Sequence, residues 1–385
     1  MSISVAIVIP AYREASYIEK TLDSIEKSVQ YSIEKNWIPR VIVVVNNPIQ
    51  ISEEFRKENQ RLVSALVELK SAYSFPIDVL DYTDPGIQNG VGEARKIGMN
   101  YAVAKYLHNP KDLIASLDAD CSVDLNYVST LFQMKLTGTG FTLFFKHALD
   151  HEPMIFYELY LRYLRWGHIV ARSPFAYYSI GSSLGTNVQN YTKVGGMISK
   201  SATEDFHFLN KLRKLGPIQY WTQTSVMPST RQSERVTLGT GYFISQSKGG
   251  LDQAISKLMI PHPSDFEKLQ IVLSILGQFD GNSSLAEAFE QENLSEIYQD
   301  LHQNKAIEKI YSIFENTTSP MTYQNRLIEV IDALETLRIL RGLWKKRKQE
   351  MSQDLFLRWA NQLWKTNDMT AKDLLMHVRT LELNA

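Results

Sequence analysis

The sequence contains a single cysteine, Cys121, among its 385 residues, so no disulfide can form within the chain. A chain of this length can bury a large core, and its folding needs neither a disulfide nor a structural metal. One lone cysteine is typical of a reducing compartment. Long apolar runs are also absent. The N-terminal run, residues 3–9, is short and lacks a preceding basic segment, and no stretch reaches the roughly 18 residues of a membrane span. These absences predict a cytoplasmic protein and leave open a peripheral contact with the inner face of the membrane.

Neither sign of charge is in excess. The chain has 41 Lys+Arg and 42 Asp+Glu, with a net charge of −1. Binding to nucleic acid needs a concentrated basic face, so we expect no nucleic-acid partner. The basic run at residues 341–348, which includes Trp344, fits either a membrane-surface helix or, more usually, a solvated helix face. The oligomeric state stays open.

Apolar runs alternate with helical periodicity in the first 120 residues. The runs rich in β-branched residues lie at 3–9, 40–45, 77–80 and 112–117. The helical segments lie at 14–30, 52–72 and 90–107. This alternation predicts a βαβ sheet of mostly parallel strands. Ligands of such sheets bind outside the carboxyl ends of the strands, where polar residues follow each run.

The pattern changes beyond about residue 245, where glycine becomes sparse and helical periodicity dominates. Helices are expected at 266–276 and along an apolar stripe over 330–344. We therefore predict an α/β domain over 1–245 and a helical region of unknown role over 246–385. The aromatic segment 155–178 is expected to be core, with stacking on an acceptor sugar or contact with lipid as alternatives.

Two carboxylates, Asp118 and Asp120, flank Ala119 directly after an apolar run. Carboxylate oxygens suit Mg²⁺ or Mn²⁺, and phosphate oxygens and water can complete the coordination. A cation held there would neutralise a departing diphosphate, which is the difficult part of breaking a sugar–phosphate bond. The alternative is a solvated turn, because aspartate is common after strands.

Four motifs follow one another along the chain. They are VAIVIPAYREASYIEKTLDSI, GVGEARKIG, DLIASLDADCSVDLNYV, and Gly195-Gly196 followed by Thr203-Glu204-Asp205. Together they resemble glycosyltransferase family 2, over residues 3 to about 215. The resemblance implies a GT-A type α/β fold, with a mostly parallel sheet flanked by helices and a C-terminal helical appendage. It also implies transfer of a sugar from a UDP- or GDP-linked donor with the help of Mn²⁺ or Mg²⁺.

The resemblance assigns donor-binding roles to residues of the first three motifs. The loop that holds base and ribose is matched by Pro10, Ala11, Tyr12 and Glu14. Asn46 lies where the family often has aspartate, which leaves the base open. Arg95 matches a family arginine near the diphosphate, with Lys96 where asparagine is usual. Asp118 and Asp120 match the metal-binding pair, with Asp118 closer to base and ribose.

Glu204-Asp205 looks like the family's ED motif, in which the aspartate is the general base for the acceptor hydroxyl. In-line attack by that oxygen would invert the anomeric centre, although the GT-A architecture hosts retention as well. The structural alternative is a helix start, with Thr203 as N-cap and acids in the first turn. Both interpretations can hold together.

Other residues follow the family less closely. Gln219-Tyr220-Trp221 does not fit the Q-x-x-R-W motif of polymer-making members, which argues against polymer synthesis. Arg231 and Arg235 lie in a loop over 228–241 that can close on the diphosphate; the alternative is a solvated loop. Histidines that are weak candidates for a third metal ligand are His147, His151, His168 and His207.

Two further functions compete with sugar transfer. A nucleotidyltransferase would carry a glycine-rich phosphate loop after the first strand, where this chain has PAYREAS. A catalytically inactive, transferase-like scaffold is the other alternative, and the retained acids argue against it. The acceptor stays open among a saccharide, a small metabolite and a lipid carrier.

Overall fold

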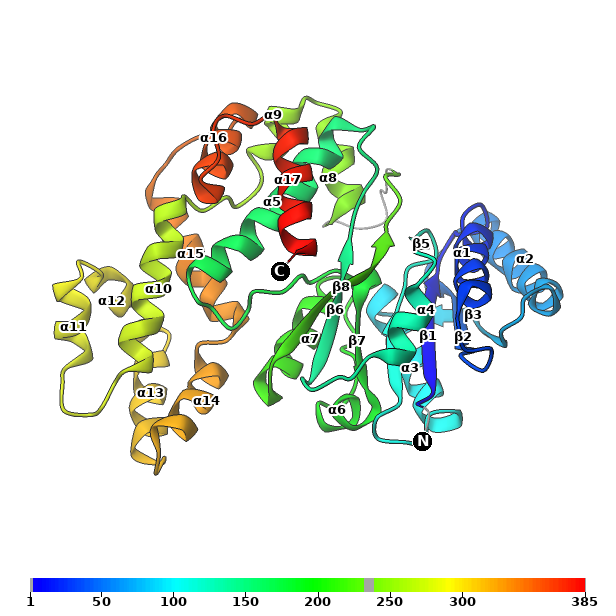
Figure 1. Ribbon diagram of the computed structural model, residues 1–385, viewed down its shortest axis with the longest axis horizontal. Coiled ribbons are helices and arrows are strands. Elements are labelled where there is room, and N and C mark those ends of the chain that lie inside the picture. Colours follow the sequence, from blue (N-terminus) through cyan, green and yellow to red (C-terminus); the bar gives the residue numbers. More distant parts are fainter. Residues whose placement is uncertain (1–2, 232–238, 385) are drawn as a thin grey trace. The chain divides into compact units, whose positions relative to one another are not determined.

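The computed structural model describes residues 3–231 and 239–384 (Figure 1). By its internal contacts the chain divides into two compact units. Unit 1 comprises Met1–Asp150, Tyr177–Tyr242 and Glu382–Ala385, and unit 2 comprises His151–Ala176 and Phe243–Leu381. The predicted domains 1–245 and 246–385 remain a prediction, whereas the contacts group residues 151–176 with the C-terminal helices.

Unit 1 is built on an eight-stranded sheet, counted within the described residues, in the order β3-β2-β1-β4-β7-β6-β8-β5. The strands are β1 (Val5–Ala11), β2 (Arg40–Pro48), β3 (Ile77–Ile87), β4 (Leu113–Ser116), β5 (Ser122–Val123), β6 (Gly140–Phe145), β7 (Leu184–Asn187) and β8 (Ile218–Met227). Strands β1 to β4 are parallel to one another. Because β7 is antiparallel to both β4 and β6, strands β6 and β8 run in the same direction as β4. The predicted α/β class with a mostly parallel sheet is confirmed.

Helices cover both faces of this sheet, which is why β1 and β2 read as continuous apolar runs rather than as alternating ones. The helices of unit 1 are α1 (Ile18–Tyr31), α2 (Glu53–Leu69), the 3₁₀ turn η1 (Lys70–Ala72), α3 (Gly90–Lys105), α4 (Tyr127–Gln133), the 3₁₀ turn η2 (Gly181–Ser183), α6 (Val188–Lys193) and α7 (Glu204–Leu215). Ile7 and Ile9 of β1 share a core with α1, α2 and α4. Ala6 and Val8 share the opposite core with α3, α6 and α7.

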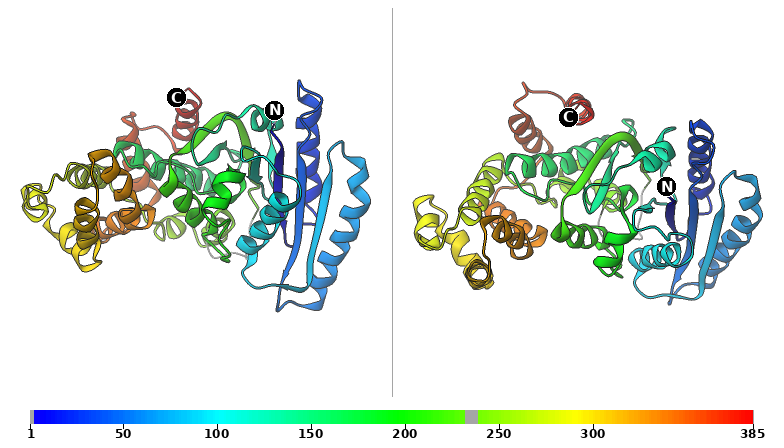
Figure 2. Two further views of the ribbon diagram at one scale, coloured as in Figure 1. Left: turned by 90° about the horizontal axis from the view of Figure 1, so that it is seen from below. Right: turned by 60° about the horizontal axis from the view of Figure 1, so that its bottom comes forward.

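Unit 2 is helical. Its elements are α5 (Glu152–Val170), α8 (Thr240–Ser247, whose first residues belong to unit 1), α9 (Leu251–Ile255), α10 (Pro263–Gly277), α11 (Leu285–Gln291), α12 (Ser295–Gln303), α13 (Ala306–Glu315), α14 (Pro320–Val330), α15 (Ala333–Lys346), α16 (Gln353–Trp364) and α17 (Ala371–Leu383, whose last residues belong to unit 1) (Figures 1 and 2). None of the helices in the described part of the chain combines the length and apolar character that a bilayer crossing demands.

The aromatic segment on α5 forms core, as the sequence predicts. Tyr163 is fully buried and meets Phe266 and Phe356 edge-on, each at 5.6 Å between ring centroids. On the same helix, the buried Glu158 accepts hydrogen bonds from Arg162 and from Arg379 of α17. A fully buried carboxylate therefore has its charge balanced inside this unit.

Three details differ from the sequence prediction. Strand β3 extends to Ile87, well beyond the predicted 77–80, because its later residues continue to pair with β2. The predicted helix over 330–344 is broken at Ile331 and Asp332, where the Asp332 side chain caps α15. The basic run is not a solvated face throughout, because Arg347 pairs with the buried Asp265, whereas the pair of Lys346 with Glu296 is exposed.

Gly98 on α3 lets that helix approach the sheet closely. A Cβ atom at this position would lie 2.4 Å from Val8 Cγ1 and 2.9 Å from Val44 Cγ2. We expect Gly98→Ala to lower the free energy of unfolding by about 1–3 kcal/mol through overpacking. Gly277→Ala is the matched control: a Cβ there meets open space, so this change is expected to be neutral or stabilising by up to about 1 kcal/mol. Urea unfolding measures both, and equal effects would contradict the packing argument.

Candidate functional site

The carboxyl ends of six strands bring the candidate residues to one edge of the sheet in unit 1. Strands β1, β2, β3 and β4 end there, and β6 and β8 run in the same direction. Asp118 and Asp120 follow β4, and Ser229 and Arg231 follow β8. Helix α7 precedes β8 and runs back along it, which places Glu204 at the same edge. Topology therefore gathers residues that are more than one hundred positions apart.

A buried arginine joins two of the predicted acids. The Arg95 guanidinium donates through Nη2 to Asp118 Oδ1 at 2.5 Å and through Nη1 to Glu204 Oε1. The side chains of Arg95 and Glu204 are each only 4% exposed, and that of Asp118 is 37% exposed. Burial alone would lower the pKa of Arg95, but the charges of Asp118, Glu204 and Asp205 outweigh it and raise that pKa. The guanidinium is therefore a permanent cation at the centre of the site.

The glycine motif at the start of α3 makes this contact geometrically possible. A Cβ on Gly92 would lie 2.3 Å from the Lys200 carbonyl oxygen and 2.9 Å from Glu204 Cβ. The first turn of α3 therefore packs directly against the segment that leads into α7. Thr203 precedes α7 with φ 61°, and its side chain makes no cap hydrogen bond. Thr203 thus holds the predicted N-cap position, with Glu204 and Asp205 in the first turn, but its left-handed backbone is not the extended conformation that a capping side chain needs.

Asp205 lies next to this cluster in the first turn of α7. Its Oδ1 accepts a hydrogen bond of 2.7 Å from the Phe206 backbone N–H. Burial, followed by the charge of Glu204, raises the pKa of Asp205 to about 7, and Arg95 opposes that rise. A carboxyl group with such a pKa can exchange a proton near neutral pH. This property is what a general base requires.

A second arginine holds the other predicted metal ligand. Arg231 Nε donates to Asp120 Oδ2 at 2.6 Å, and Arg231 Nη2 donates to Glu14 Oε1. Ser229 Oγ donates to the same Asp120 oxygen at 2.9 Å. The guanidinium also lies over the Tyr17 ring, 4.2 Å from its centroid. Neither Ser229 nor Tyr17 was predicted as a site residue, although Tyr17 lies within the first motif and Ser229 in the loop over 228–241.

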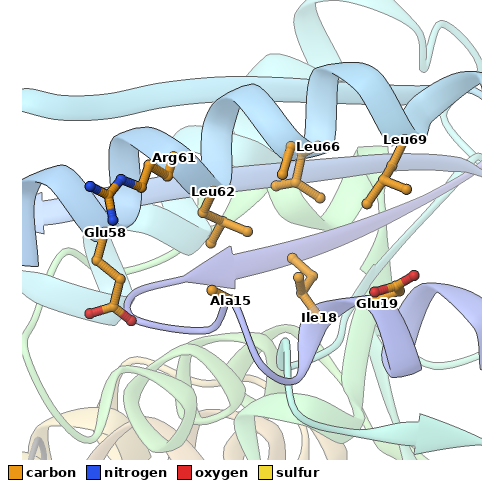
Figure 3. A pocket seen from close by; sticks show the side chains of 9 residues that line it. Ala15, Ile18, Glu19, Glu58, Arg61, Leu62, Leu66 and Leu69 are labelled. Atoms are coloured by element: carbon orange, nitrogen blue, oxygen red, sulfur yellow. The ribbon is translucent and has the colours of Figure 1, made fainter.

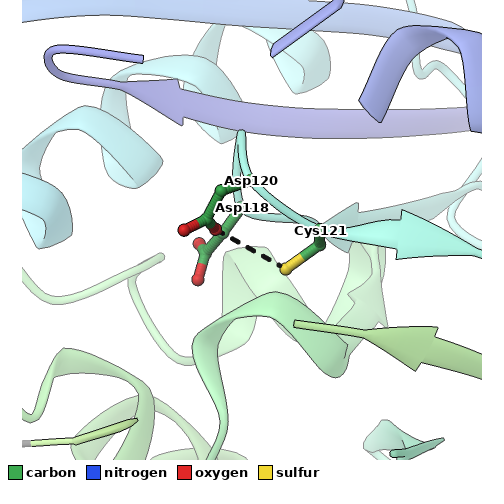
Figure 4. Close-up of side chains that lie close together, drawn as sticks. All are labelled: Asp118, Asp120 and Cys121. Atoms are coloured by element: carbon green, nitrogen blue, oxygen red, sulfur yellow. Dashed lines mark hydrogen bonds between the residues drawn. The ribbon is translucent and has the colours of Figure 1, made fainter. Parts of the chain in front are cut away.

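The metal-binding potential of the site depends on which atoms near β4 are hard donors. One ligand atom from each of Asp118, Asp120 and Cys121 lies within 4.8 Å of the others (Figure 4). Burial, followed by the two aspartate charges, raises the pKa of Cys121 well above its usual range, so its thiol stays protonated. A neutral thiol does not suit Mg²⁺ or Mn²⁺. The two carboxylates do, with phosphate oxygens or water to complete the coordination.

The remaining predicted ligands lie elsewhere or outside the described residues. The group near β4 contains none of the histidines among residues 3–231 and 239–384. His207 Nε2 lies 3.0 Å from Lys200 Nζ, and His168 is buried in unit 2, where burial lowers its pKa to about 4. Arg235 lies outside the described residues.

The predicted base and ribose residues lie at the ends of β1 and β2. Pro10 and Ala11 are the last residues of β1, and Tyr12 and Glu14 follow in the loop before α1. Asn46 is buried near the end of β2. Their direct contact with a nucleotide stays a prediction.

Sequence reasoning missed the support beneath this loop. Asn59 Nδ2 donates to Asn47 Oδ1 at 2.5 Å, and Asn59 Oδ1 accepts from the Arg13 backbone N–H at 2.9 Å. Asn47 Nδ2 donates to the Thr83 carbonyl oxygen at 2.8 Å. These buried amides tie α2, β2 and β3 to the loop that carries Glu14. The sequence offered only the asparagine pair at the end of β2 as a signal, because Asn59 lies inside a helix.

Among its described residues, unit 1 has at least two pockets. The larger, about 730 Å³, adjoins Asp120. Its lining is Tyr17, Lys20, Thr21, Asp120, Cys121, Ser122, Lys146, His147, Ala148, Leu149, Met227, Pro228, Ser229 and Thr230. The smaller, about 270 Å³, lies between α1 and α2, where Leu62, Leu66 and Leu69 point toward Ala15 and Ile18 (Figure 3). Only the larger pocket shares a residue with the predicted chemistry.

No protein-family model and no curated protein matches the chain. Among solved structures, it is similar to TarS of S. aureus in complex with UDP-GlcNAc, with 10% identity and a TM-score of 0.43 over 99% of this chain and 90% of that one. TarS in complex with UDP gives 11% identity and a TM-score of 0.44 over 90% and 92%. The mannosyltransferase PcManGT from Pyrobaculum calidifontis, in complex with GDP-Man and Mn²⁺, gives 14% identity and a TM-score of 0.41 over 88% of each chain. These values describe a distant likeness.

Removal of the buried cation should destabilise unit 1. We expect Arg95→Met to lower the free energy of unfolding by about 3–5 kcal/mol, because it leaves the buried Glu204 carboxylate without its partner. Lys57→Met breaks the exposed pair with Glu53 and should change stability by less than about 1 kcal/mol. Adding Glu204→Gln to Arg95→Met should restore part of the loss. Urea unfolding of the three variants measures these changes. Equal losses of unfolding free energy in Arg95→Met and Lys57→Met would refute the central role of Arg95.

Proposed function

We propose that this chain is a GT-A type glycosyltransferase that moves a sugar from a nucleoside-diphosphate donor to an acceptor hydroxyl with inversion. The observation that carries the proposal is the convergence of two kinds of acid at one sheet edge. Asp118 and Asp120 form a pair of hard oxygen ligands, and Asp205 nearby has a pKa of about 7. Sugar transfer needs both a site for a diphosphate-bound cation and a base for the acceptor.

The donor set near β4 fits Mn²⁺ or Mg²⁺. Asp118 and Asp120 would hold the cation, and in the structure Arg95 engages only one oxygen of Asp118. When bound there, such a cation supplies positive charge to the departing diphosphate. These ligands do not distinguish Mn²⁺ from Mg²⁺, since both metals prefer oxygen.

The chain's own residues account for the remaining steps. Asp205 accepts the proton of the acceptor hydroxyl as that oxygen forms its bond to the anomeric carbon. The bond between that carbon and the diphosphate oxygen breaks at the same time, and its electron pair leaves with the diphosphate. Attack from the face opposite the diphosphate inverts the anomeric centre. Arg95 keeps Asp118 and Glu204 in place, which makes it a positioning residue in this scheme.

The donor lies across the β1–β2 ends in this proposal. Pro10, Ala11 and Tyr12 form one wall, and Glu14 accepts hydrogen bonds from ribose hydroxyls. Asn46 offers an amide to the edge of the base, which is uracil or guanine. Arg231 meets the diphosphate. The acceptor is a saccharide, a small metabolite or a lipid carrier, and its hydroxyl must reach Asp205.

Metal-dependent nucleotide binding is the first expected outcome. Thermal unfolding with UDP, GDP and their sugar conjugates should show stabilisation by one base series only when Mn²⁺ is present. A ligand at 100-fold its dissociation constant adds about 2.7 kcal/mol to the folded state. Asp120→Asn should abolish this stabilisation, whereas Asp354→Asn, which removes an exposed acid on α16, should leave it intact. Absence of any nucleotide effect on the native chain would favour an inactive scaffold.

The role of Asp205 predicts a particular dependence on pH. Because the base must be ionised, kcat/KM should rise about tenfold per pH unit below pH about 7 and level off above it. Asp205→Asn should lower kcat by about 10²–10⁴-fold while nucleotide-dependent stabilisation persists. Steady-state rates across pH provide the measurement, and a fully active Asp205→Asn enzyme would eliminate this residue as the base.

The raised pKa of Asp205 also predicts that stability falls with rising pH, whereas activity is expected to rise. The folded pKa of Asp205, about 7, lies above its ordinary value of 3.8, so the folded state disfavours ionisation. The protein should therefore lose stability as the pH rises from 3.8 through 7, relative to Asp205→Asn. Urea unfolding of both chains at pH values from 3.8 to about 7 tests this sign. A constant difference across that range would contradict it.

A further inference from the structure

One guanidinium covers two carboxylates that the proposed donor complex needs. Arg231 donates to Asp120, the proposed metal ligand, and to Glu14, the proposed ribose acceptor. The three side chains are largely out of water, with exposed fractions of 18% for Arg231, 18% for Asp120 and 9% for Glu14. Two carboxylates in such an environment repel each other unless a cation lies between them. Arg231 supplies that cation.

The contact at Asp120 leaves no room for a metal on the same oxygen. Asp120 Oδ2 accepts from Arg231 Nε at 2.6 Å and from Ser229 Oγ at 2.9 Å. A carboxylate oxygen has about two lone-pair sites, so both are used. A divalent cation bound to Asp120 would also lie next to the Arg231 guanidinium, and two positive charges that share one carboxylate repel each other strongly. Tight binding of a metal therefore competes with Arg231.

We infer that Arg231 is an internal counter-cation that occupies Asp120 and Glu14 until a divalent metal and a nucleoside diphosphate displace it together. This inference rests on the proposed function. The metal would neutralise Asp120 in place of Arg231, and the ribose hydroxyls would hydrogen-bond to Glu14. The diphosphate would then pair with the released guanidinium. Metal alone provides only the first exchange. Arg231 thereby makes metal binding conditional on the nucleotide.

The two arginines of the site differ in whether they can leave. Arg95 is 4% exposed at its side chain and bridges Glu204, which is equally buried, so its departure would leave an unpaired buried charge. Arg231 is more exposed, and both of its partners face incoming ligands in the proposed complex. The pocket of about 730 Å³ beside Asp120, Ser229 and Tyr17 provides adjacent space. Exchange at Arg231 therefore does not disturb the core.

Linkage gives the inference a measurable form. A residue that competes with a ligand for its site weakens the binding of that ligand, and its removal strengthens binding. Coupling between two ligands through one protein element is typically about 5–150-fold. We therefore expect Arg231→Gln to bind Mn²⁺ in the absence of nucleotide at least about fivefold more tightly than the native chain does. Addition of UDP or GDP should improve Mn²⁺ binding less in this variant than in the native chain.

The experiment is a titration of the full chain with Mn²⁺, followed by the electron paramagnetic resonance signal of free Mn²⁺, with and without UDP or GDP. Ser229→Ala is the matched control, because it removes a donor to the same Asp120 oxygen but no charge. It should change Mn²⁺ affinity much less than Arg231→Gln does. Arg231→Lys keeps one charge but cannot bridge both carboxylates, and it should fall between Arg231→Gln and the native chain. Circular dichroism establishes that each variant is folded.

The outcomes separate this inference from the proposed function. If the native chain binds Mn²⁺ with nucleotide through Asp120, yet Arg231→Gln and Arg231→Lys bind Mn²⁺ alone no more tightly than the native chain, the counter-cation inference is overturned while the proposed donor site stands. If Asp120→Asn binds Mn²⁺ and nucleotide as well as the native chain does, the proposed metal site fails, and the inference fails with it. Tightening in Arg231→Gln but not in Ser229→Ala supports charge competition.

Discussion

The buried Arg95 guanidinium is the interaction on which the rest of the site depends. Its contacts with Asp118 and Glu204 tie the end of β4 to the start of α7 through α3. Neutralised in this way, two acids can remain at a crowded strand edge. Gly92 permits the approach, because any larger residue would collide with the segment before α7. The position of Asp205 follows, since it is the next residue along the same helix.

Arg231 also neutralises two neighbouring carboxylates, but it is less buried than Arg95. It neutralises Asp120 and Glu14 from a segment after β8, and these are the residues that we propose as contacts of a metal and a ribose. One arginine is therefore a fixed part of the scaffold and the other an exchangeable occupant of the proposed site. The difference follows from burial, because the energetic penalty of an unpaired charge grows as water is excluded.

Much of this arrangement could be predicted from the sequence, but its contacts could not. Continuous apolar runs predicted β1, β2 and β4, and polar residues after them predicted the functional edge. The length of β3 was missed because its later residues are polar and hold their place by pairing with β2. The break between α14 and α15 was missed because the apolar stripe continues across it. The hydrophobic pattern of the sequence shows which face of a helix or strand is buried. Strand pairing and side-chain capping determine where the helix or strand ends.

The sequence by itself determined the α/β class, the sheet edge at which we propose that ligands bind, and several of the acids that gather there. Each of these depends on local periodicity or on residues next to a strand end. Only the tertiary structure decided which charges meet. Arg231 and Glu14 are 217 positions apart, and Arg95 and Glu204 are 109 apart. Motif and resemblance singled out both arginines, but they did not indicate which carboxylates each one meets. Their partners are fixed by sheet order and by close packing of α3, because a buried guanidinium is stable only where carboxylates already converge.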